Sequence, residues 1–149
     1  MIVVNENALK IAVDFDGTIV ENNYPRIGRE MMFAFATMKE LQKRGHLLIL
    51  WTFRTGRLLD EAVEYCRAQG IEFYAVNESY PGELATGSFP RKLNVDLFID
   101  DRNVGGFIGW SRVWQLLSPG DSDMALLHPE AHRNFPGTKR PFFGFRKRR

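Results

Sequence analysis

The chain has 149 residues, of which 44% are hydrophobic and 26% are charged. This is an ordinary globular composition, long enough for one domain with a core, and it excludes collagenous, mucin-like and wholly disordered proteins. The single cysteine, Cys66, excludes an internal disulfide framework and a cysteine-based zinc cage. The N-terminal sequence lacks a signal-peptide pattern, and no segment approaches the roughly 20 apolar residues that span a bilayer, so we expect a soluble cytoplasmic protein.

Basic residues are concentrated at one end of the sequence. Residues 133–149 contain seven Lys or Arg and no acidic residue, whereas the other 132 residues contain 13 basic and 18 acidic residues, a net charge of −5. We therefore expect a core domain over residues 1–132 and an irregular basic tail over residues 133–149. Such a tail either attracts nucleic acid or another polyanion, or is a solvated terminus with no specific partner.

Short β-type apolar runs alternate with helical periods along the sequence, which is typical of an α/β domain with a mostly parallel central sheet. The predicted strands cover residues 10–15, 46–51, 73–76 and 96–99. The predicted helices, each with apolar residues three or four positions apart, cover about 28–44, 55–69 and 110–117. Cys66 falls on the apolar face of the second helix and is interpreted as a core residue. The pattern predicts a three-layer, Rossmann-like domain.

Polar residues follow three of the predicted strands. Asp14 and Asp16 follow the first, Thr52 follows the second, and Asp100 and Asp101 follow the fourth. Open α/β sheets bind ligands at this edge, where the strands end. Four carboxylates in one crevice would repel one another and raise one another's pKa, and a divalent cation would offset that repulsion. Carboxylate oxygens suit Mg²⁺, so the sequence predicts a magnesium site.

The same residues carry a resemblance to a known family. The run DFDGTI at residues 14–19 resembles the first motif of the haloacid dehalogenase superfamily, DxDGT followed by an apolar residue. Thr52 is similar to the Thr or Ser of the second motif, and Lys92 is similar to the basic residue of the third. The run FIDD at residues 98–101 resembles the acidic fourth motif. The four motifs occur in the family's order and span residues 10–101.

The resemblance implies a phosphatase of this superfamily. Asp14 would attack phosphorus to give an aspartyl phosphate. Asp16 would act as general acid and base, and its backbone carbonyl would bind Mg²⁺. Dehalogenating members lack an acid at the position of Asp16, so this chain has the phosphatase form.

The resemblance also implies how the phosphate and the metal are held. Thr52 would donate a hydrogen bond to a phosphoryl oxygen, and Lys92 would supply positive charge, with the adjacent Arg91 as the alternative. Asp100 and Asp101 would divide direct and water-mediated contact with Mg²⁺, and Asp100 is the favoured direct ligand. From the residues alone, Arg54 is a further candidate for contact with the substrate phosphate, the alternative being a solvated charge.

The spacing between motifs leaves no room for a cap domain. Between Asp16 and Thr52 lie 35 residues, and between Thr52 and Lys92 lie 39, most of them taken up by predicted elements. Capless relatives act on bulky phosphates or borrow a lid from a neighbouring subunit of an oligomer. Tyr80, Phe89 and Trp110 are candidates to line the mouth of the site, with ordinary packing as the alternative.

Three functions stay open at this stage. The first is a phosphatase that hydrolyses a small phosphomonoester. The second is a polynucleotide 3′-phosphatase that uses the basic tail, because the run DDR at residues 100–102 also resembles the fourth motif of those enzymes. The third is a non-catalytic protein that binds anions.

Overall fold

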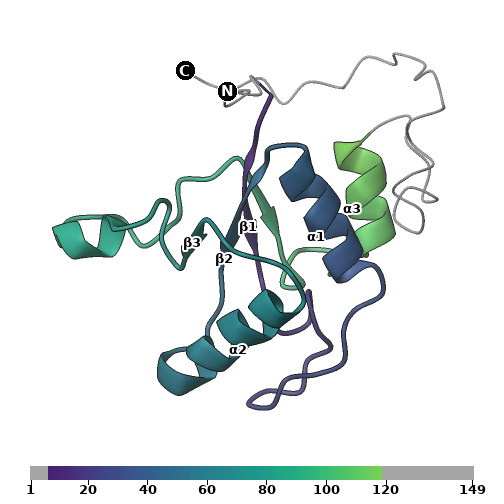
Figure 1. Cartoon of the computed structure of the whole chain (residues 1–149), viewed down its shortest axis with the longest axis horizontal. Coiled ribbons are helices and arrows are strands. Elements are labelled where there is room, and N and C mark those ends of the chain that lie inside the picture. Colours follow the sequence, from purple (N-terminus) through teal and green to yellow (C-terminus); the bar gives the residue numbers. More distant parts are fainter. Residues whose placement is uncertain (1–6, 119–149) are drawn as a thin grey trace.

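In the computed structural model, the described residues are 7–118, which form four strands, three α-helices and a short 3₁₀ helix (Figure 1). The strands are β1 (Lys10–Val13), β2 (Leu47–Leu50), β3 (Ala75–Val76) and β4 (Leu97–Ile99). The helices are α1 (Ala34–Lys43), α2 (Gly56–Ala68), α3 (Trp110–Leu117) and the 3₁₀ helix η1 (Glu83–Thr86). The predicted basic tail, residues 133–149, lies outside the described residues, as does the predicted domain boundary at residue 132.

The four strands form one parallel sheet in the order β3-β2-β1-β4. The chain moves from β1 outward to β2 and β3, then returns past β1 to add β4 on the other side. Parallel strands end at the same edge, and the reversal of direction places a topological switch point between β1 and β4. Ligands of open α/β sheets bind in the crevice at such a point.

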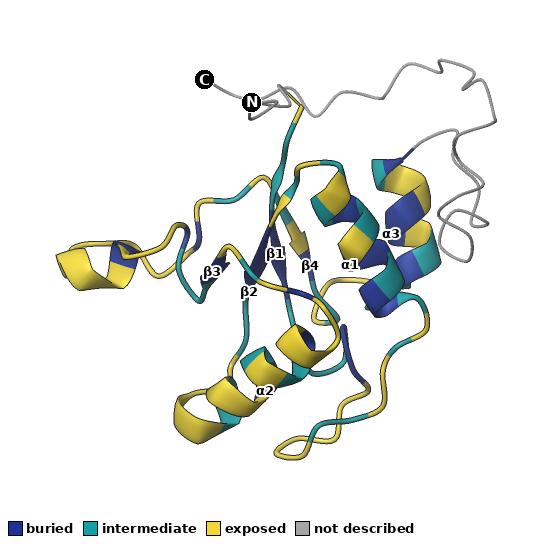
Figure 2. Ribbon diagram, in the orientation of Figure 1, coloured by how far each residue is buried: buried dark blue, intermediate teal, exposed yellow. Residues whose placement is uncertain are grey.

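One face of the sheet packs against all three helices. Ile11 and Val13 of β1 belong to the same buried cluster as Leu48 and Leu50 of β2, as expected from the two-residue period of a strand. Figure 2 shows the buried residues in dark blue on the strands and on parts of the helices. The helices contribute Phe35, Met38, Leu41, Ala62, Cys66, Trp110, Val113 and Trp114.

Cys66 is a core residue, as the sequence predicts. It lies on the buried side of α2, and burial raises the pKa of its thiol to about 12. A thiol with that pKa is uncharged at neutral pH and is a poor nucleophile.

The other face of the sheet is covered by the crossover between β3 and β4. Ala12, Ile49 and Ala75 form a second, smaller cluster with Leu93 of this crossover. The 3₁₀ helix η1 lies in the same crossover but extends away from the sheet and is largely exposed (Figures 1 and 2). The prediction of a three-layer α/β domain is confirmed, and in the part of the chain that the structure describes the third layer is this crossover.

The first helix begins later than predicted. The apolar spacing predicts a helix from about residue 28, but α1 begins at Ala34. Residues 20–30 form a hairpin instead, in which the Glu21 N–H donates to the Arg29 carbonyl (2.8 Å), so these backbone groups are not available to a helix. At Gly28 a Cβ atom would collide with the backbone carbonyl of Glu21, so the two sides of the hairpin can approach this closely only at a glycine.

A helix crosses a bilayer only where it is both long and apolar. Over residues 7–118, no helix has both properties.

The buried indole of Trp110 links α3 to the turn that follows β1. Its Nε1–H donates to the Thr18 carbonyl (2.7 Å). We expect Trp110→Phe, which keeps an aromatic ring but removes the donor, to lower the free energy of unfolding by about 1–3 kcal/mol, because the carbonyl loses a buried partner. Urea denaturation measures this change.

Leu116→Ala, on the exposed side of the same helix, is the matched control and should cost within about 0.5 kcal/mol. Equal losses in the two variants would show that the Trp110 hydrogen bond does not hold the turn.

Candidate functional site

Asp14 lies at the switch point between β1 and β4. It directly follows the last residue of β1, and its N–H donates to the carbonyl of Ile99, the last residue of β4 (2.9 Å). Its half-buried carboxylate accepts a hydrogen bond from the Thr18 hydroxyl (3.0 Å). The end of the sheet therefore fixes the backbone of Asp14, and the following turn orients its side chain.

The turn after Asp14 contains a glycine that the site requires. Gly17 has a φ of +87°, a conformation that residues with a Cβ rarely adopt. The carboxylate of Asp101 occupies the space where a Cβ atom of residue 17 would lie. Any side chain at position 17 would push Asp101 away from the turn.

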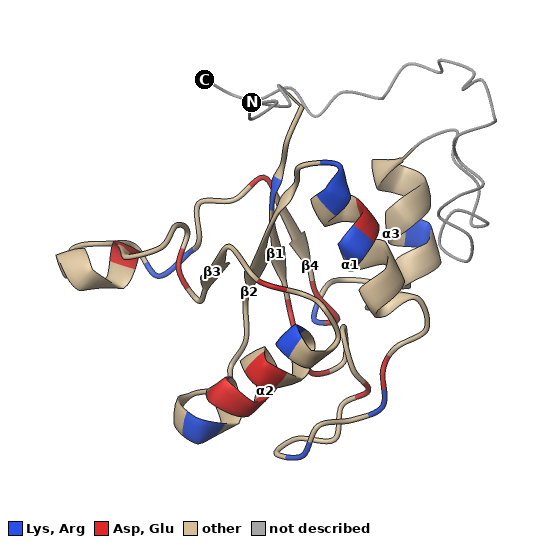
Figure 3. Ribbon diagram, viewed as in Figure 1, with Lys and Arg blue, Asp and Glu red and all other residues tan. Residues whose placement is uncertain are grey.

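Three carboxylates meet at this point. Asp14, Asp100 and Asp101 each place a carboxylate oxygen within 4.8 Å of the others. Burial, together with the negative charges of Asp100 and Asp101, raises the pKa of Asp14 to about 7. Figure 3 shows the acidic residues that follow β1 and β4 at one edge of the sheet. Mutual repulsion and a set of hard oxygen donors fit a bound Mg²⁺.

Asp16 does not join this cluster with its side chain. The sequence predicts that four carboxylates converge, but Asp16 forms an ion pair with Arg54 instead, and both of its oxygens accept guanidinium N–H groups at 2.7 Å. The planar guanidinium matches a carboxylate in this paired geometry, which is why Asp16 faces Arg54 rather than the other acids. A metal contact through the backbone carbonyl of Asp16 stays a prediction.

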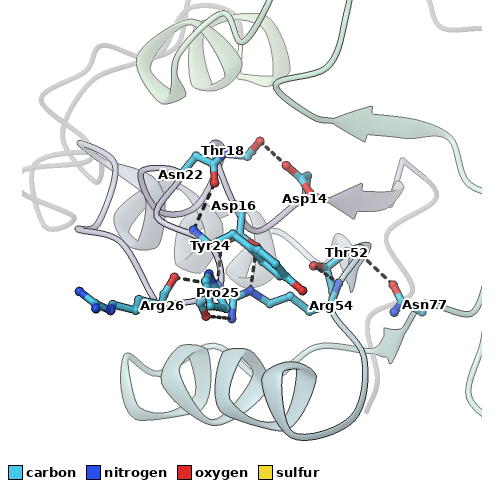
Figure 4. Close-up of polar contacts among 10 residues, drawn as sticks. All are labelled: Asp14, Asp16, Thr18, Asn22, Tyr24, Pro25, Arg26, Thr52, Arg54 and Asn77. Carbon is cyan, nitrogen blue, oxygen red and sulfur yellow. Dashed lines mark hydrogen bonds and ion pairs between the residues drawn. The ribbon is translucent and has the colours of Figure 1, made fainter.

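Arg54 is buried, so it is not the solvated charge that the sequence offers as one alternative, and its contact with a substrate phosphate stays a prediction. Its side chain is fully buried, and beyond Asp16 it donates to the carbonyls of Pro25 (3.0 Å) and Arg26 (2.9 Å) in the hairpin (Figure 4). These bonds use the Nε donor and both terminal nitrogens of the guanidinium. The structure therefore makes Arg54 a positioning residue for Asp16 and for the hairpin.

Thr52 follows β2 at the same edge of the sheet. Its N–H donates to the Asn77 side chain (2.8 Å), and its hydroxyl oxygen accepts the Arg54 N–H (3.1 Å). Because the oxygen is the acceptor in that bond, the hydroxyl proton stays available to a ligand.

These groups open into a cavity of about 580 Å³, within the usual size range of small-molecule sites. Its lining residues are Asp14, Asp16, Asn22, Tyr24, Trp51, Thr52, Phe53, Asp100 and Arg102. The cavity thus brings together the ends of β1, β2 and β4, as the sequence predicts for Asp14, Asp16, Asp100 and Thr52. The remaining acidic residue, Asp101, lies beside Asp14 and Asp100 but does not line the cavity.

Several predicted residues lie outside this lining. Lys92 and its alternative Arg91 are exposed and do not line the cavity. The predicted mouth residues Tyr80, Phe89 and Trp110 do not line it either. The part of the crossover around η1 projects away from the sheet (Figure 1), and Trp110 is a buried core residue, as the packing alternative predicts.

Five lining residues are absent from the site that the sequence predicts. Trp51 and Phe53 flank Thr52 in the sequence, so their neighbour is an available signal. Arg102 follows the acidic pair and enters the prediction only as part of the DDR run. Asn22 and Tyr24 lie in the hairpin, before the predicted helix, and nothing in their sequence context marks them.

Neither family models nor curated proteins match this chain. One solved structure, described as that of a conserved protein from Bacteroides thetaiotaomicron, is similar to it. The two chains are 55% identical, the match covers 82% of this chain and 98% of the other, and the TM-score is 0.72. The neighbour supports the α/β fold, and the extent of the identity shows that this chain belongs to the same family as that conserved Bacteroides thetaiotaomicron protein.

Proposed function

We propose that this protein is a Mg²⁺-dependent phosphatase of the haloacid dehalogenase type. The observation that supports the proposal best is the meeting of Asp14, Asp100 and Asp101 within 4.8 Å, at the switch point of the sheet. The Thr52 hydroxyl lines the same cavity as Asp14 and Asp100 and has a proton to donate. A nucleophilic carboxylate, a cation site and a phosphate donor in one cavity are what phosphoryl transfer through an aspartyl phosphate needs.

The acidic trio would hold the metal ion. Asp14, Asp100 and Asp101 offer hard oxygen ligands, and we keep Asp100 as the proposed direct ligand of the acidic pair. When bound, Mg²⁺ would offset the negative charge of the carboxylates and of the phosphoryl oxygens.

The proposed reaction has two displacements at phosphorus. An oxygen of Asp14 forms a bond to phosphorus while the bond to the leaving oxygen breaks, and Asp16 gives that oxygen a proton. Water then attacks the phosphorus of the aspartyl phosphate, Asp16 takes a proton from the water, and the bond to Asp14 breaks to release inorganic phosphate. Thr52 donates to a phosphoryl oxygen in both steps.

The Arg54 ion pair supports the second displacement. It fixes the carboxylate of Asp16 in one orientation, as required of a base that must meet an attacking water. The first displacement needs a proton on Asp16, and a protonated carboxyl would release part of its hold on Arg54. We therefore propose that the carboxyl group of Asp16 changes its position against the Arg54 guanidinium between the two steps.

Positive charge for the phosphoryl group comes from a neighbouring basic residue. We keep Lys92 as the proposed donor, with Arg91 as its alternative, which requires the exposed side chain to extend into the cavity. The Asn94 N–H donates to Ser79 Oγ (2.9 Å) beyond the carboxyl end of β3, so this part of the crossover passes close to the correct edge of the sheet. Arg102 already lines the cavity and is the second cation that we propose.

The wider setting of the reaction is also a proposal. We place the enzyme in the cytoplasm, where a free thiol such as Cys66 stays reduced. Hydrolysis at the end of a polynucleotide is the alternative that would use the basic tail. A lid supplied by a second subunit is a further alternative, because only a hairpin and α1 lie between β1 and β2.

Asp14→Asn tests the nucleophile. We expect Mg²⁺-dependent release of phosphate from phenyl phosphate by the wild-type protein, and a loss of about 10³-fold or more in the variant, because an amide cannot form the aspartyl phosphate. A colorimetric assay of released phosphate, with and without Mg²⁺, measures the rate.

Asp60→Asn, on the exposed side of α2, is the matched control and should keep full activity. If the wild-type protein bound Mg²⁺ but released no phosphate from any monoester, the chain would be the non-catalytic anion-binding protein instead.

The raised pKa of Asp14 predicts a pH-dependent stability in the metal-free protein. Asp14 titrates at about 7 in the folded protein and at about 3.8 when unfolded, so the folded form binds more protons between these pH values. Its contribution to the free energy of unfolding is complete below pH 4 and is lost as the pH rises through about 7. In a chelator at about pH 8, we expect Asp14→Asn to raise the Tm by roughly 2–4 °C.

Thermal unfolding followed by circular dichroism tests this expectation, with Asp60→Asn as control. At about pH 4 the Tm difference between Asp14→Asn and wild type should disappear. A difference that is the same at both pH values would refute the role of Asp14 charge. Added Mg²⁺ should raise the wild-type Tm more at about pH 8 than at about pH 5, since protons compete for the carboxylate.

Arg54→Lys tests the positioning of Asp16. Lysine keeps the charge but cannot bind both carboxylate oxygens in the paired geometry. We expect kcat to fall by roughly 10²-fold while KM changes little, because Asp16 is displaced and the phosphate contacts stay in place. Steady-state kinetics on phenyl phosphate gives both constants.

Arg57→Lys, an exposed neighbour at the start of α2, is the matched control. Equal kinetic constants in the two variants would limit Arg54 to a structural role.

A further inference from the structure

We propose that the substrate is a small phosphomonoester whose leaving group carries a planar ring, held against Phe53 and Tyr24. This inference rests on the proposed phosphatase function and names the class of leaving group. Its basis is the part of the cavity lining that the phosphate chemistry does not use, which is mainly aromatic: Tyr24, Trp51 and Phe53, with Asn22 as the other residue.

Phe53 is placed where a leaving group would emerge. It directly follows Thr52, lines the same cavity as Asp14, and has 90% of its surface exposed. A single exposed apolar side chain is common on proteins, but this one borders a catalytic cavity together with two other aromatic side chains. Such a ring offers its face to an incoming planar group, and stacking would remove one face of each ring from water.

Tyr24 is the fixed partner of this pair. Its ring lies against the guanidinium of Arg54 (Figure 4). The Arg54 Cζ atom is 5.4 Å from the ring centroid. Arg54 is fully buried and held by Asp16 and by two carbonyls of the hairpin, so it provides a rigid support. Half of the Tyr24 surface stays exposed toward solvent and the cavity. A platform that is already ordered binds a ring at a low entropic cost.

The cavity lining is chemically divided in a way that fits such a substrate. Carboxylates and the Thr52 hydroxyl serve the phosphate, and the aromatic side chains serve what is attached to it. A volume of about 580 Å³ is larger than a phosphate with a short aliphatic chain would fill. A long polyanion would meet the acidic residues around the cavity, so the geometry favours a single nucleotide or an aryl phosphate over a polynucleotide end.

The sharpest test compares two substrates that differ only in the ring. Adenosine 5′-monophosphate and ribose 5-phosphate share the sugar phosphate, and only the first carries a planar base. With the full chain and Mg²⁺, we expect kcat/KM to be about tenfold higher or more for adenosine 5′-monophosphate, as base stacking on aromatic side chains implies. We expect this ratio to fall about tenfold in Phe53→Ala and to persist in Phe53→Trp, which keeps a stacking ring.

Phe89→Ala is the matched control, since Phe89 is a partly exposed aromatic residue outside the cavity lining, and it should keep the wild-type ratio. Phenyl phosphate separates the two sources of the ring: preference for it over adenosine 5′-monophosphate indicates an aryl phosphate, and the reverse indicates a nucleotide. A wild-type ratio near one, or a ratio that Phe53→Ala leaves unchanged, would overturn the inference. So would a preference for a 5′- or 3′-phosphorylated oligonucleotide.

Failure of this inference can be told from failure of the proposed function. If hydrolysis depends on Asp14 but is as efficient for ribose 5-phosphate as for adenosine 5′-monophosphate, the protein is a phosphatase without the aromatic site. If no monoester is hydrolysed, calorimetric titration of both ligands in the presence of Mg²⁺ still tests the ring. Tighter binding of adenosine 5′-monophosphate that depends on Phe53 would then support the aromatic site alone, and equal binding would overturn it.

Discussion

The buried guanidinium of Arg54 joins three segments that are distant in the sequence. It binds Asp16 in the turn after β1, it binds the carbonyls of Pro25 and Arg26 in the hairpin, and it extends from the loop after β2. A fully buried cation is costly unless its donors are satisfied, so the turn, the hairpin and the loop can pack together only in the arrangement that satisfies them. The position of Asp16 and the shape of the cavity both depend on this one group.

The same edge of the sheet buries its negative charge in two different ways. Asp16 is neutralised by a cation of the protein, and that pairing fixes its orientation. Asp14, Asp100 and Asp101 instead lie against one another, and burial together with their mutual repulsion raises the pKa of Asp14. Repulsion of this kind lowers stability and persists where it serves function, because a site with unmatched charge is ready for a cation. The contrast separates the proposed acid and base residue, which the fold holds in place, from a cluster suited to a metal ion.

The sequence predicts the parts of the site that depend on strand ends and misses the parts that depend on side-chain pairing. A strand's carboxyl end can be located from an apolar run, and topology then brings Asp14, Thr52 and Asp100 to one edge. Asp16 pairs with Arg54 through a tertiary contact between residues 38 positions apart, and no local sequence pattern indicates this pairing. The hairpin was likewise concealed, since the apolar residues before α1 continue the period of the helix that follows.

The proposed recognition of the substrate and the positioning of the proposed catalytic residues depend on the same short segments. With only a hairpin and α1 between β1 and β2, the groups that could contact a leaving group come from that hairpin and from the loop after β2. Tyr24 rests on the guanidinium that holds Asp16, and Phe53 adjoins the hydroxyl of Thr52. A change that widens the cavity at either aromatic residue therefore also acts on the groups proposed to move protons or bind phosphate. Substitutions that vary ring contact while preserving volume, such as one aromatic residue for another, are the ones that can alter specificity without disturbing the turn after β1.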